Sequence, residues 1–168
     1  DMIVDSDSNN VITINEPHSF GGGNLEIEVP VRTNLNLQSH NGSIISVDGV
    51  EGDIEATNHN GSVNMSNVSG SVVAYSHNGK VVVAFRDTAP DRPMSFSSMN
   101  GNVDLTLPAS AKANLKMRTD NGTIWSDFDI QRKANPSGGK TVDGTINGGG
   151  ADFDLRTHNG NIFLRRAK

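Results

Sequence analysis

Residues 53–83, DIEATNHNGSVNMSNVSGSVVAYSHNGKVVV, decide the fold of this chain. The dipeptide Asn-Gly occurs twice in this stretch, and on both sides of it apolar residues alternate with polar ones. Alternation with a period of two predicts strands that show one face to a core. Asn and Gly tolerate a positive φ better than other residues, so the pair predicts a sharp turn between two strands.

The same unit recurs along the rest of the chain. Apolar residues stand six and four positions before the Asn of each unit, and Ile or Val stands three positions after it. A second glycine turn, such as VSGSV, separates successive units, so one coil of about 18–20 residues holds two strands and two turns. The six units are centred on Asn41-Gly42, Asn60-Gly61, Asn78-Gly79, Asn100-Gly101, Asn121-Gly122 and Asn159-Gly160.

Two all-β architectures fit this repeat. One is a β-helix or β-solenoid, in which the strands of each coil lie in parallel on those of the previous coil. The other is an antiparallel β meander or sandwich built from Asn-Gly hairpins. The first three motifs are spaced by 19 and 18 residues. This near-constant spacing favours the β-solenoid, because coils of equal length place Asn on Asn and Ser on Ser in hydrogen-bonded ladders.

Three segments depart from the repeat. Residues 1–23 are expected to form an N-terminal edge or cap, and residues 86–93 to form a loop. Residues 131–150 are the longest insertion, and insertions in a repeat array usually lie on one face, often the face that binds. We therefore expect one repeat domain over residues 24–168, with its insertion at 131–150.

Composition and charge exclude several functions. The chain has 168 residues and no cysteine, so disulfides and thiolate metal sites are excluded. Residues 1–79 carry ten acidic groups and one basic group, which argues against a nucleic-acid partner. No apolar run reaches the roughly 18 residues of a membrane span. The sequence begins at Asp1, which we interpret as a trimmed start whose targeting segment, with any membrane attachment it provided, was removed.

The order of these elements resembles the bacterial putative adhesin family, a β-strand-repeat domain of unknown function. The resemblance rests on LEIEVP at 25–30, VDLTLP at 103–108, the Asn-Gly units and the closing GGGADFDLRTHNGNIFLRR at 148–166. It covers about residues 24–168. It implies a β-helical fold, export or membrane attachment in bacteria, and no assigned catalytic residues.

Histidines recur directly before Asn-Gly, at His40, His59, His77 and His158. If the coils stack, the first three form a column with a rise near the strand spacing of about 4.8 Å. Neighbouring imidazoles could then share Zn²⁺ or Ni²⁺. Met99 takes the same place in another repeat, which indicates instead a turn position that accepts any side chain. Protonation of a stacked column near pH 6 would create like-charge repulsion and loosen this edge.

Carboxylates flank the insertion in two alternate-residue pairs, Asp127 with Asp129 and Asp152 with Asp154. Some β-helical enzymes act on polysaccharides with paired carboxylates, so these four residues are candidates for ligand binding. Trp125 joins them, because an exposed Trp beside a loop can stack on a sugar or a partner. Simple outward-facing strand positions also explain the aspartates, and Trp125 could instead pack under the insertion. A further acidic cluster at 48–55 could bind Ca²⁺ or form a solvated face.

We therefore expect a non-enzymatic repeat domain of the bacterial cell envelope, at the cell surface or in the periplasm, without a cofactor. It would display a rigid β surface to a glycan or to a protein of the envelope or of a host. Two alternatives stay open. One is a regulatory or scaffolding module in the periplasm or near the membrane. The other is a carbohydrate-active β-helix enzyme that uses the aspartate pairs.

Overall fold

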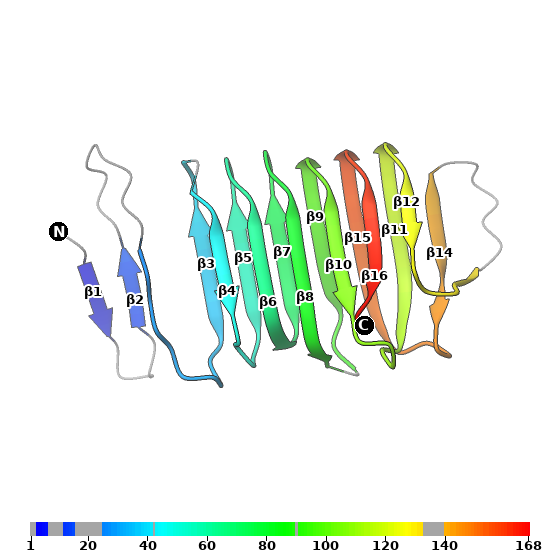
Figure 1. The fold of residues 1–168 in the computed structure, drawn as a ribbon. Coiled ribbons are helices and arrows are strands. Elements are labelled where there is room, and N and C mark those ends of the chain that lie inside the picture. The colour runs from blue at the N-terminus through cyan, green and yellow to red at the C-terminus, as the bar shows by residue number, and fades with distance from the viewer. Residues whose placement is uncertain (1–2, 7–11, 16–24, 42, 90, 133–139) are drawn as a thin grey trace.

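The computed structural model describes residues 3–6, 12–15, 25–41, 43–89, 91–132 and 140–168 (Figure 1). These residues form strands, turns and extended segments, and none of them is helical. The predicted all-β class is therefore confirmed. Of the predicted N-terminal segment 1–23, two short strands are described, and the remainder lies outside the described residues.

The strands of the described residues form three sheets. In spatial order, the larger sheet has eight: β13 (Gln131–Arg132), β14 (Thr141–Ile146), β11 (Ala113–Asn121), β15 (Ala151–Asn159), β9 (Met94–Asn100), β7 (Val72–Ser76), β5 (Ile54–Asn58) and β3 (Leu35–Ser39). The second sheet has six: β12 (Ile124–Ser126), β16 (Ile162–Arg166), β10 (Val103–Leu107), β8 (Val81–Thr88), β6 (Val63–Gly70) and β4 (Ile45–Asp48). A separate antiparallel pair consists of β1 (Ile3–Ser6) and β2 (Ile12–Asn15).

Each Asn-Gly unit carries the chain from the eight-stranded sheet into the six-stranded sheet. β5, for example, leads through Asn60-Gly61 into β6. Strands of neighbouring coils pair in parallel and in register, as Ile54 with Val72 and Val63 with Val81 show. Figure 1 shows the coils standing side by side in a row. An Asn-Gly hairpin would have placed both of its strands in one sheet, so the β-solenoid is confirmed and the antiparallel alternative is wrong.

Side-chain ladders run along the Asn-Gly edge from coil to coil. In one ladder, four of the motif asparagines donate from Nδ2 to the Oδ1 of the Asn in the adjacent coil at 2.8–3.0 Å. In a second ladder, the Ser or Thr two residues before the Asn donates to the glycine carbonyl of the adjacent coil at 2.7–2.8 Å. The expected stacking of like residues is confirmed. The asparagine ladder joins Asn60, Asn78, Asn100, Asn159 and Asn121 in that order.

The glycine of each motif is needed for a different reason than the one expected. None of the described motif glycines has a positive φ. A Cβ built on Gly79 would instead lie 2.5 Å from both the carbonyl carbon and the carbonyl oxygen of Gly61 in the adjacent coil. The backbones of adjacent coils stack so closely that only the hydrogen atom of glycine fits in the place of a side chain at this position. A positive φ occurs at the second turn of the coil, where Gly70 has φ 109°.

The core lies between the two large sheets. Inward side chains alternate with outward ones along most strands of these two sheets, as in β10, where Val103, Leu105 and Leu107 are buried. Aromatic rings fill the centre, with Phe96 edge-on to Phe85 and Phe153 at centroid distances of 6.1 and 6.2 Å. Because burial of this apolar surface is continuous from coil to coil, the array forms one structural unit.

The order of the coils departs from the order of the sequence at one place. β15 pairs with β9 on one side and with β11 on the other, and β16 lies between β10 and β12. The last coil of the sequence is thus inserted between two earlier coils, as the red strands of Figure 1 show. The expectation that each coil lies on the previous one is correct for the first four coils and for the last, which lies on the fifth. It is wrong for the fifth coil, which is separated from the fourth by the last coil.

The predicted insertion at 131–150 closes one end of the array. β14 pairs with β11 in antiparallel orientation, and β13 pairs with β14. Residues 133–139 lie outside the described residues. The turn that joins β14 to β15 is anchored by Asn147, whose Nδ2 donates to the carbonyl oxygens of Ala109 and Ala111 at 3.0 and 2.7 Å. The predicted loop at 86–93 is also shorter than expected, because β8 continues to Thr88.

Candidate functional site

Two of the three histidines of the predicted column, His59 and His77, stack on one another. The rings of His59 and His77 stack with centroids 4.8 Å apart and planes 6° apart. Two parallel rings direct their in-plane nitrogen lone pairs side by side rather than toward a shared point, so this arrangement does not suit one bridging metal ion. His40 is exposed in the preceding coil. Among the described residues, no group of three or more His, Asp or Glu is arranged to hold a metal.

His158 belongs to the inserted coil and has another neighbour. Its Nδ1 lies 2.8 Å from Oδ2 of Asp120. Hydrogen bonds from His158 and then from Arg118 lower the pKa of the Asp120 carboxyl from its ordinary value of 3.8. The loosening of the Asn-Gly edge in acid stays a prediction. The Asp120 carboxylate is a further group at that edge that gains a proton in acid.

The structure separates the predicted carboxylate pairs. Asp152 and Asp154 lie on β15, on the outer face of the eight-stranded sheet. Asp152 Oδ1 accepts from Asn114 Nδ2 at 2.8 Å, and Asp154 pairs with Arg156 at 2.6 Å. Asp127 follows β12 at the six-stranded sheet, so it lies on the other side of the core, and the exposed Asp129 comes after it in the chain. The two pairs therefore do not converge on one substrate.

Trp125 is exposed over 59% of its surface and does not pack under the insertion. It lies on β12, the edge strand of the six-stranded sheet, directly beside Phe163 of β16. A shallow depression of about 220 Å³ opens here. Two of the predicted site residues, Trp125 and Asp127, line it together with Phe163, Leu164 and Arg165.

The guanidinium group of Arg165 is held over this depression by three contacts. Its Nε donates to both carboxylate oxygens of Asp104, at 2.8 and 3.0 Å. Its Cζ lies 5.0 Å from the centroid of the Phe163 ring, in a cation–π contact. The Asp104 carboxylate raises the pKa of Arg165 through this hydrogen bond and its charge, and Asp127 adds a smaller contribution. Asp127 Oδ2 accepts from the backbone nitrogen of Arg166 at 3.3 Å.

The sequence pattern did not identify Phe163, Arg165 or Asp104 as site residues. Phe163 and Asp104 occupy outward strand positions that alternation alone explains. They become neighbours of Trp125 because β16 is inserted between β10 and β12. The sequence held one signal for this site. An outward position of β16 carries the aromatic residue Phe163, whereas the positions in register with it on β10 and β8 carry Asp104 and Val82.

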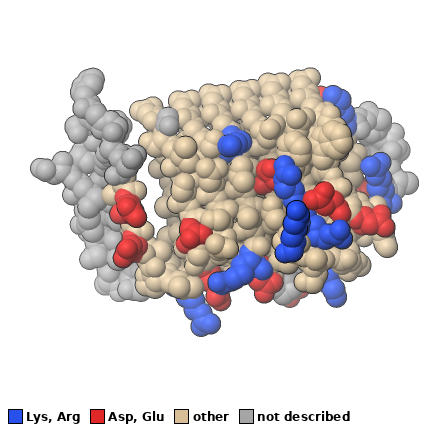
Figure 2. Space-filling model, viewed as in Figure 1, with Lys and Arg blue, Asp and Glu red and all other residues tan. Residues whose placement is uncertain are grey.

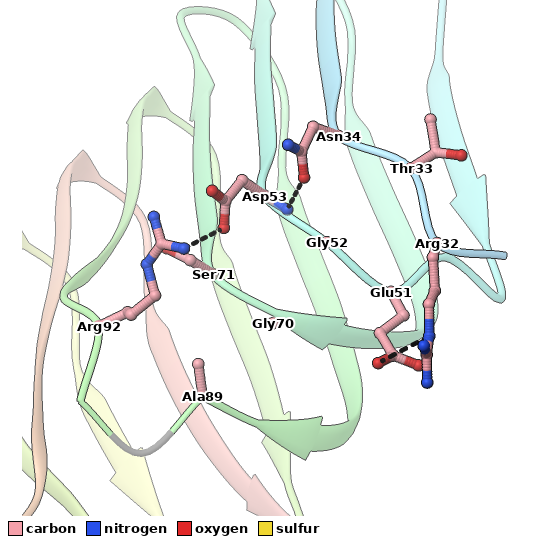
Figure 3. Close-up of a pocket in the computed structure, with 10 residues that line it drawn as sticks. All are labelled: Arg32, Thr33, Asn34, Glu51, Gly52, Asp53, Gly70, Ser71, Ala89 and Arg92. Atoms are coloured by element: carbon pink, nitrogen blue, oxygen red, sulfur yellow. Dashed lines mark hydrogen bonds and ion pairs between the residues drawn. The ribbon is translucent and has the colours of Figure 1, made fainter.

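A larger open depression of about 520 Å³ lies at the second turn of the first coils, and Figure 3 shows its lining. Its carboxylates already face arginines: Glu51 lies 3.7 Å from Arg32 and 3.6 Å from Arg86, and Asp53 lies 2.9 Å from Arg92. The acidic cluster at 48–55 is therefore neutralised in part by ion pairs. The arrangement argues against the Ca²⁺ site considered from the sequence.

Among the described side chains on the face shown in Figure 2, no extended patch carries one sign of charge. Acidic and basic side chains lie next to one another on this face, and wide areas are uncharged. The described side chains on this face form no basic stripe of the kind that binds nucleic acid, and the absence of a nucleic-acid partner stays an expectation from composition. Over the described part of the chain, no helix has the length and hydropathy to span a bilayer.

Comparison with known proteins identifies the family. The family model of the Toastrack DUF4097 domain matches residues 18–165. A solved structure, described as a putative cell adhesion protein from Clostridium sporogenes, resembles this fold with a TM-score of 0.58 and 10% sequence identity, over 99% of this chain and 76% of that chain. At this identity the likeness shows the fold alone. A search among curated proteins gave no match. Because the family model covers most of its length, the chain belongs to the Toastrack DUF4097 family.

Proposed function

We propose that this domain is a non-catalytic binding module of the bacterial cell surface, which presents the outer face of its six-stranded sheet to a glycan or a protein. The observation that carries the proposal is the exposure of Trp125 in a depression that charged side chains also line. A large aromatic side chain left in water on a rigid sheet offers contact area to a partner at low entropic cost.

The scaffold behind this surface supports the proposal. Neighbouring strands pair over their length, the core is continuous, and two hydrogen-bonded ladders tie the coils together. A surface held in this way loses little conformational entropy when it binds. The role is therefore display: the solenoid holds Trp125 and its neighbours in place before a partner arrives.

The structural neighbour supports a location outside the cytoplasm. That protein is described as a putative cell adhesion protein, and the two share their fold. We extend adhesion and surface location to this chain only as part of the proposal.

The arrangement of the carboxylates supports a binding role over catalysis. A glycosidase needs an acid and a second carboxylate on opposite sides of one bond, within about 10 Å of each other. Asp127 and the pair Asp152 and Asp154 lie on different sheets, and Asp154 is already paired with Arg156. The enzyme alternative would be supported by polysaccharide turnover that is lost in Asp127→Asn or Asp152→Asn.

Protease shaving of intact cells tests the location. The domain is detected with an antibody, and a periplasmic protein serves as the control. Cleavage of the domain while the control survives is the expected result. Protection until the outer barrier is opened would contradict surface display and favour the regulatory or scaffolding alternative within the envelope.

A binding assay tests the surface itself. Purified domain and its Trp125→Ala variant are compared for binding to glycan arrays and immobilised matrix proteins. Val73→Ala is the matched control, because Val73 is an exposed apolar residue on β7 of the other sheet. Binding that Trp125→Ala abolishes and Val73→Ala retains is expected, and equal binding by all three proteins would contradict the proposed face.

A further inference from the structure

We propose that the depression around Trp125 is a subsite for one neutral pyranose ring of a glycan, an inference that rests on the proposed function. The parts of this subsite come from three adjacent strands of the six-stranded sheet and the residues that follow them. Trp125 stands beside Phe163, and Phe163 stands beside Asp104, in one row across the sheet.

Trp125 supplies an open aromatic face. The apolar C–H face of a pyranose stacks on such a ring, as apolar ligand surface commonly does in aromatic-lined sites. The same outward row on the remaining strands carries no aromatic residue, because Val82, Asn64 and Ser46 follow Asp104 in register. The aromatic residues of this row are therefore confined to the end of the sheet where the depression lies.

Polar groups for sugar hydroxyls lie beside the ring. Asp127 and Arg165 line the same depression. One carboxylate oxygen of Asp127 accepts from the backbone of Arg166, and its other oxygen can accept from a hydroxyl. The Nε of Arg165 is occupied by Asp104, whereas a guanidinium has further N–H donors that a hydroxyl oxygen can meet. Because Asp104 and the Phe163 ring hold Arg165 in place, its donors are oriented before the sugar binds.

The size of the depression favours a sugar ring over a protein. Its volume of about 220 Å³ is below the range of roughly 300–1,000 Å³ typical of pockets for drug-sized ligands. A stable protein interface buries about 800 Å² on each partner around an apolar centre. The exposed Val73 and Met99 lie elsewhere, on the outer face of the other sheet and beside the Asn-Gly edge. Trp125 thus lies beside Phe163 and the charged side chains Asp127 and Arg165, apart from these other exposed apolar residues.

The charges favour a neutral sugar. The positive charge of Arg165 is compensated by Asp104 at 2.8 Å. Asp127 then leaves the depression with a negative charge, which would repel a uronic acid or another anionic sugar. A neutral hexose presents hydroxyls to both side chains without this repulsion.

Intrinsic fluorescence provides a direct assay, because Trp125 is the only tryptophan in the chain. The domain is titrated with maltohexaose, cellohexaose and chitohexaose as neutral probes, and with oligogalacturonate as the acidic probe. We expect at least one neutral oligosaccharide to shift the emission and saturate with a Kd on the order of 1 mM, as suits a single small contact surface. Oligogalacturonate is expected to leave the emission unchanged.

Variants separate the parts of the subsite. Asp127→Asn keeps the fluorophore, and its Kd for the same sugar is expected to rise by about threefold to tenfold through loss of a charged acceptor. Trp125→Ala is followed by calorimetry, and a loss of affinity of about tenfold or more is expected. Glu55→Gln, at an exposed carboxylate on β5 of the opposite sheet, is the matched control and should bind as the unmodified domain does. Circular dichroism of each variant checks that the fold is kept.

The pyranose subsite is wrong if no neutral probe shifts the emission, if only the acidic probe does so, or if Glu55→Gln weakens binding as much as Asp127→Asn. These outcomes are distinct from failure of the proposed function. A domain that binds a matrix protein through Trp125 but no sugar would contradict the subsite and keep surface binding. A domain that binds maltohexaose but is protected from protease on intact cells would keep the subsite and contradict surface display.

Discussion

The hydroxyl group of Thr157 donates a hydrogen bond of 2.7 Å to the carbonyl oxygen of Gly101, which lies 56 positions earlier in the chain. The same bond joins coils that are close in sequence: Ser98 donates to Gly79 at 2.8 Å, 19 positions away. The inserted last coil therefore makes the same contacts as a coil that follows its neighbour directly. The coils with Ser or Thr at this position offer equivalent donors and acceptors, so the array accepts one of them out of sequence order.

Replacing Thr157 by Val tests this bond. The side chain is 4% exposed, and valine keeps its shape while it leaves the Gly101 carbonyl without this donor. We expect the free energy of unfolding to fall by about 1–2 kcal/mol. Urea denaturation measures the change, and Thr123→Val, at an exposed position after the neighbouring Asn-Gly, is the control. An equal effect of both substitutions would contradict a specific role for the Thr157 hydroxyl group.

A methyl group on a motif glycine should force two coils apart. In Gly79→Ala the new Cβ would lie 2.5 Å from backbone atoms of Gly61, which cannot move without shifting the adjacent coil. The expected loss of stability is about 2–3 kcal/mol, with a lower melting temperature. Gly49→Ala serves as the comparison, because nothing lies within 4 Å of its Cβ, although its φ of 70° adds strain of about 1 kcal/mol. A smaller loss for Gly79→Ala than for Gly49→Ala would refute close backbone stacking as the reason for the motif glycine.

Removal of residues 151–168 should do more than shorten the array. In an ordinary solenoid the last coil of the sequence lies at the end, and its loss is tolerated in proportion to its contacts. Here β15 and β16 lie inside the array, so the truncation leaves β9 and β11 without their shared partner. We expect β11 and β14 to become susceptible to protease and the unfolding transition to broaden.

The control for this experiment is a chain that lacks only Lys168. Hydrogen exchange or limited proteolysis followed by mass spectrometry locates the exposed strands. A truncated chain that melts as a compact, shorter array would mean that β11 can stack directly on β9, and would contradict the requirement for the inserted coil.

Acid should remove a contribution of Asp120 to stability. Hydrogen bonds from His158 and Arg118 lower the pKa of this carboxyl in the folded state below its ordinary value of 3.8. When the pKa of a carboxyl is lower in the folded state than in the unfolded state, the carboxyl stabilises the fold at pH values above its unfolded-state pKa. This stabilisation is lost as the pH falls through its folded-state pKa. The gap in urea midpoint between the unmodified domain and Asp120→Asn should therefore be present at pH 6 and close below pH 3.8. A gap that stays constant down to pH 2 would contradict this linkage.

Much of the architecture could be predicted from local pattern. Apolar alternation on both sides of Asn-Gly indicates half-buried strands, and equal spacing indicates coils in register. The step of the ladder from Asn60 to Asn78 follows from that spacing, whereas Asn100 joins the ladder although it lies 22 residues further on. The reason for the motif glycine was predicted wrongly, because a tight contact between two backbones of different coils leaves no mark within one coil.

The candidate site could be predicted only in part. Trp125 and Asp127 stand two residues apart, and the structure keeps them at one depression. The partnership of these residues with Phe163 and Arg165 depends on which strand lies next to β12. The separation of Asp152 from Asp127 depends on which sheet each strand joins.

The sequence by itself determined the repeat, the strands, the Asn-Gly corners and the side-chain ladders, because these depend on residues within one coil and on its length. Only the tertiary structure decided the order of the coils, the closing of the array by β14 and the neighbours of Trp125. The physical reason is that all coils present nearly equivalent edges, so local preference does not distinguish one neighbour from another. The choice depends on the packing of the whole core and on the lengths of the connections, such as the turn at 147–150 that joins β14 to β15.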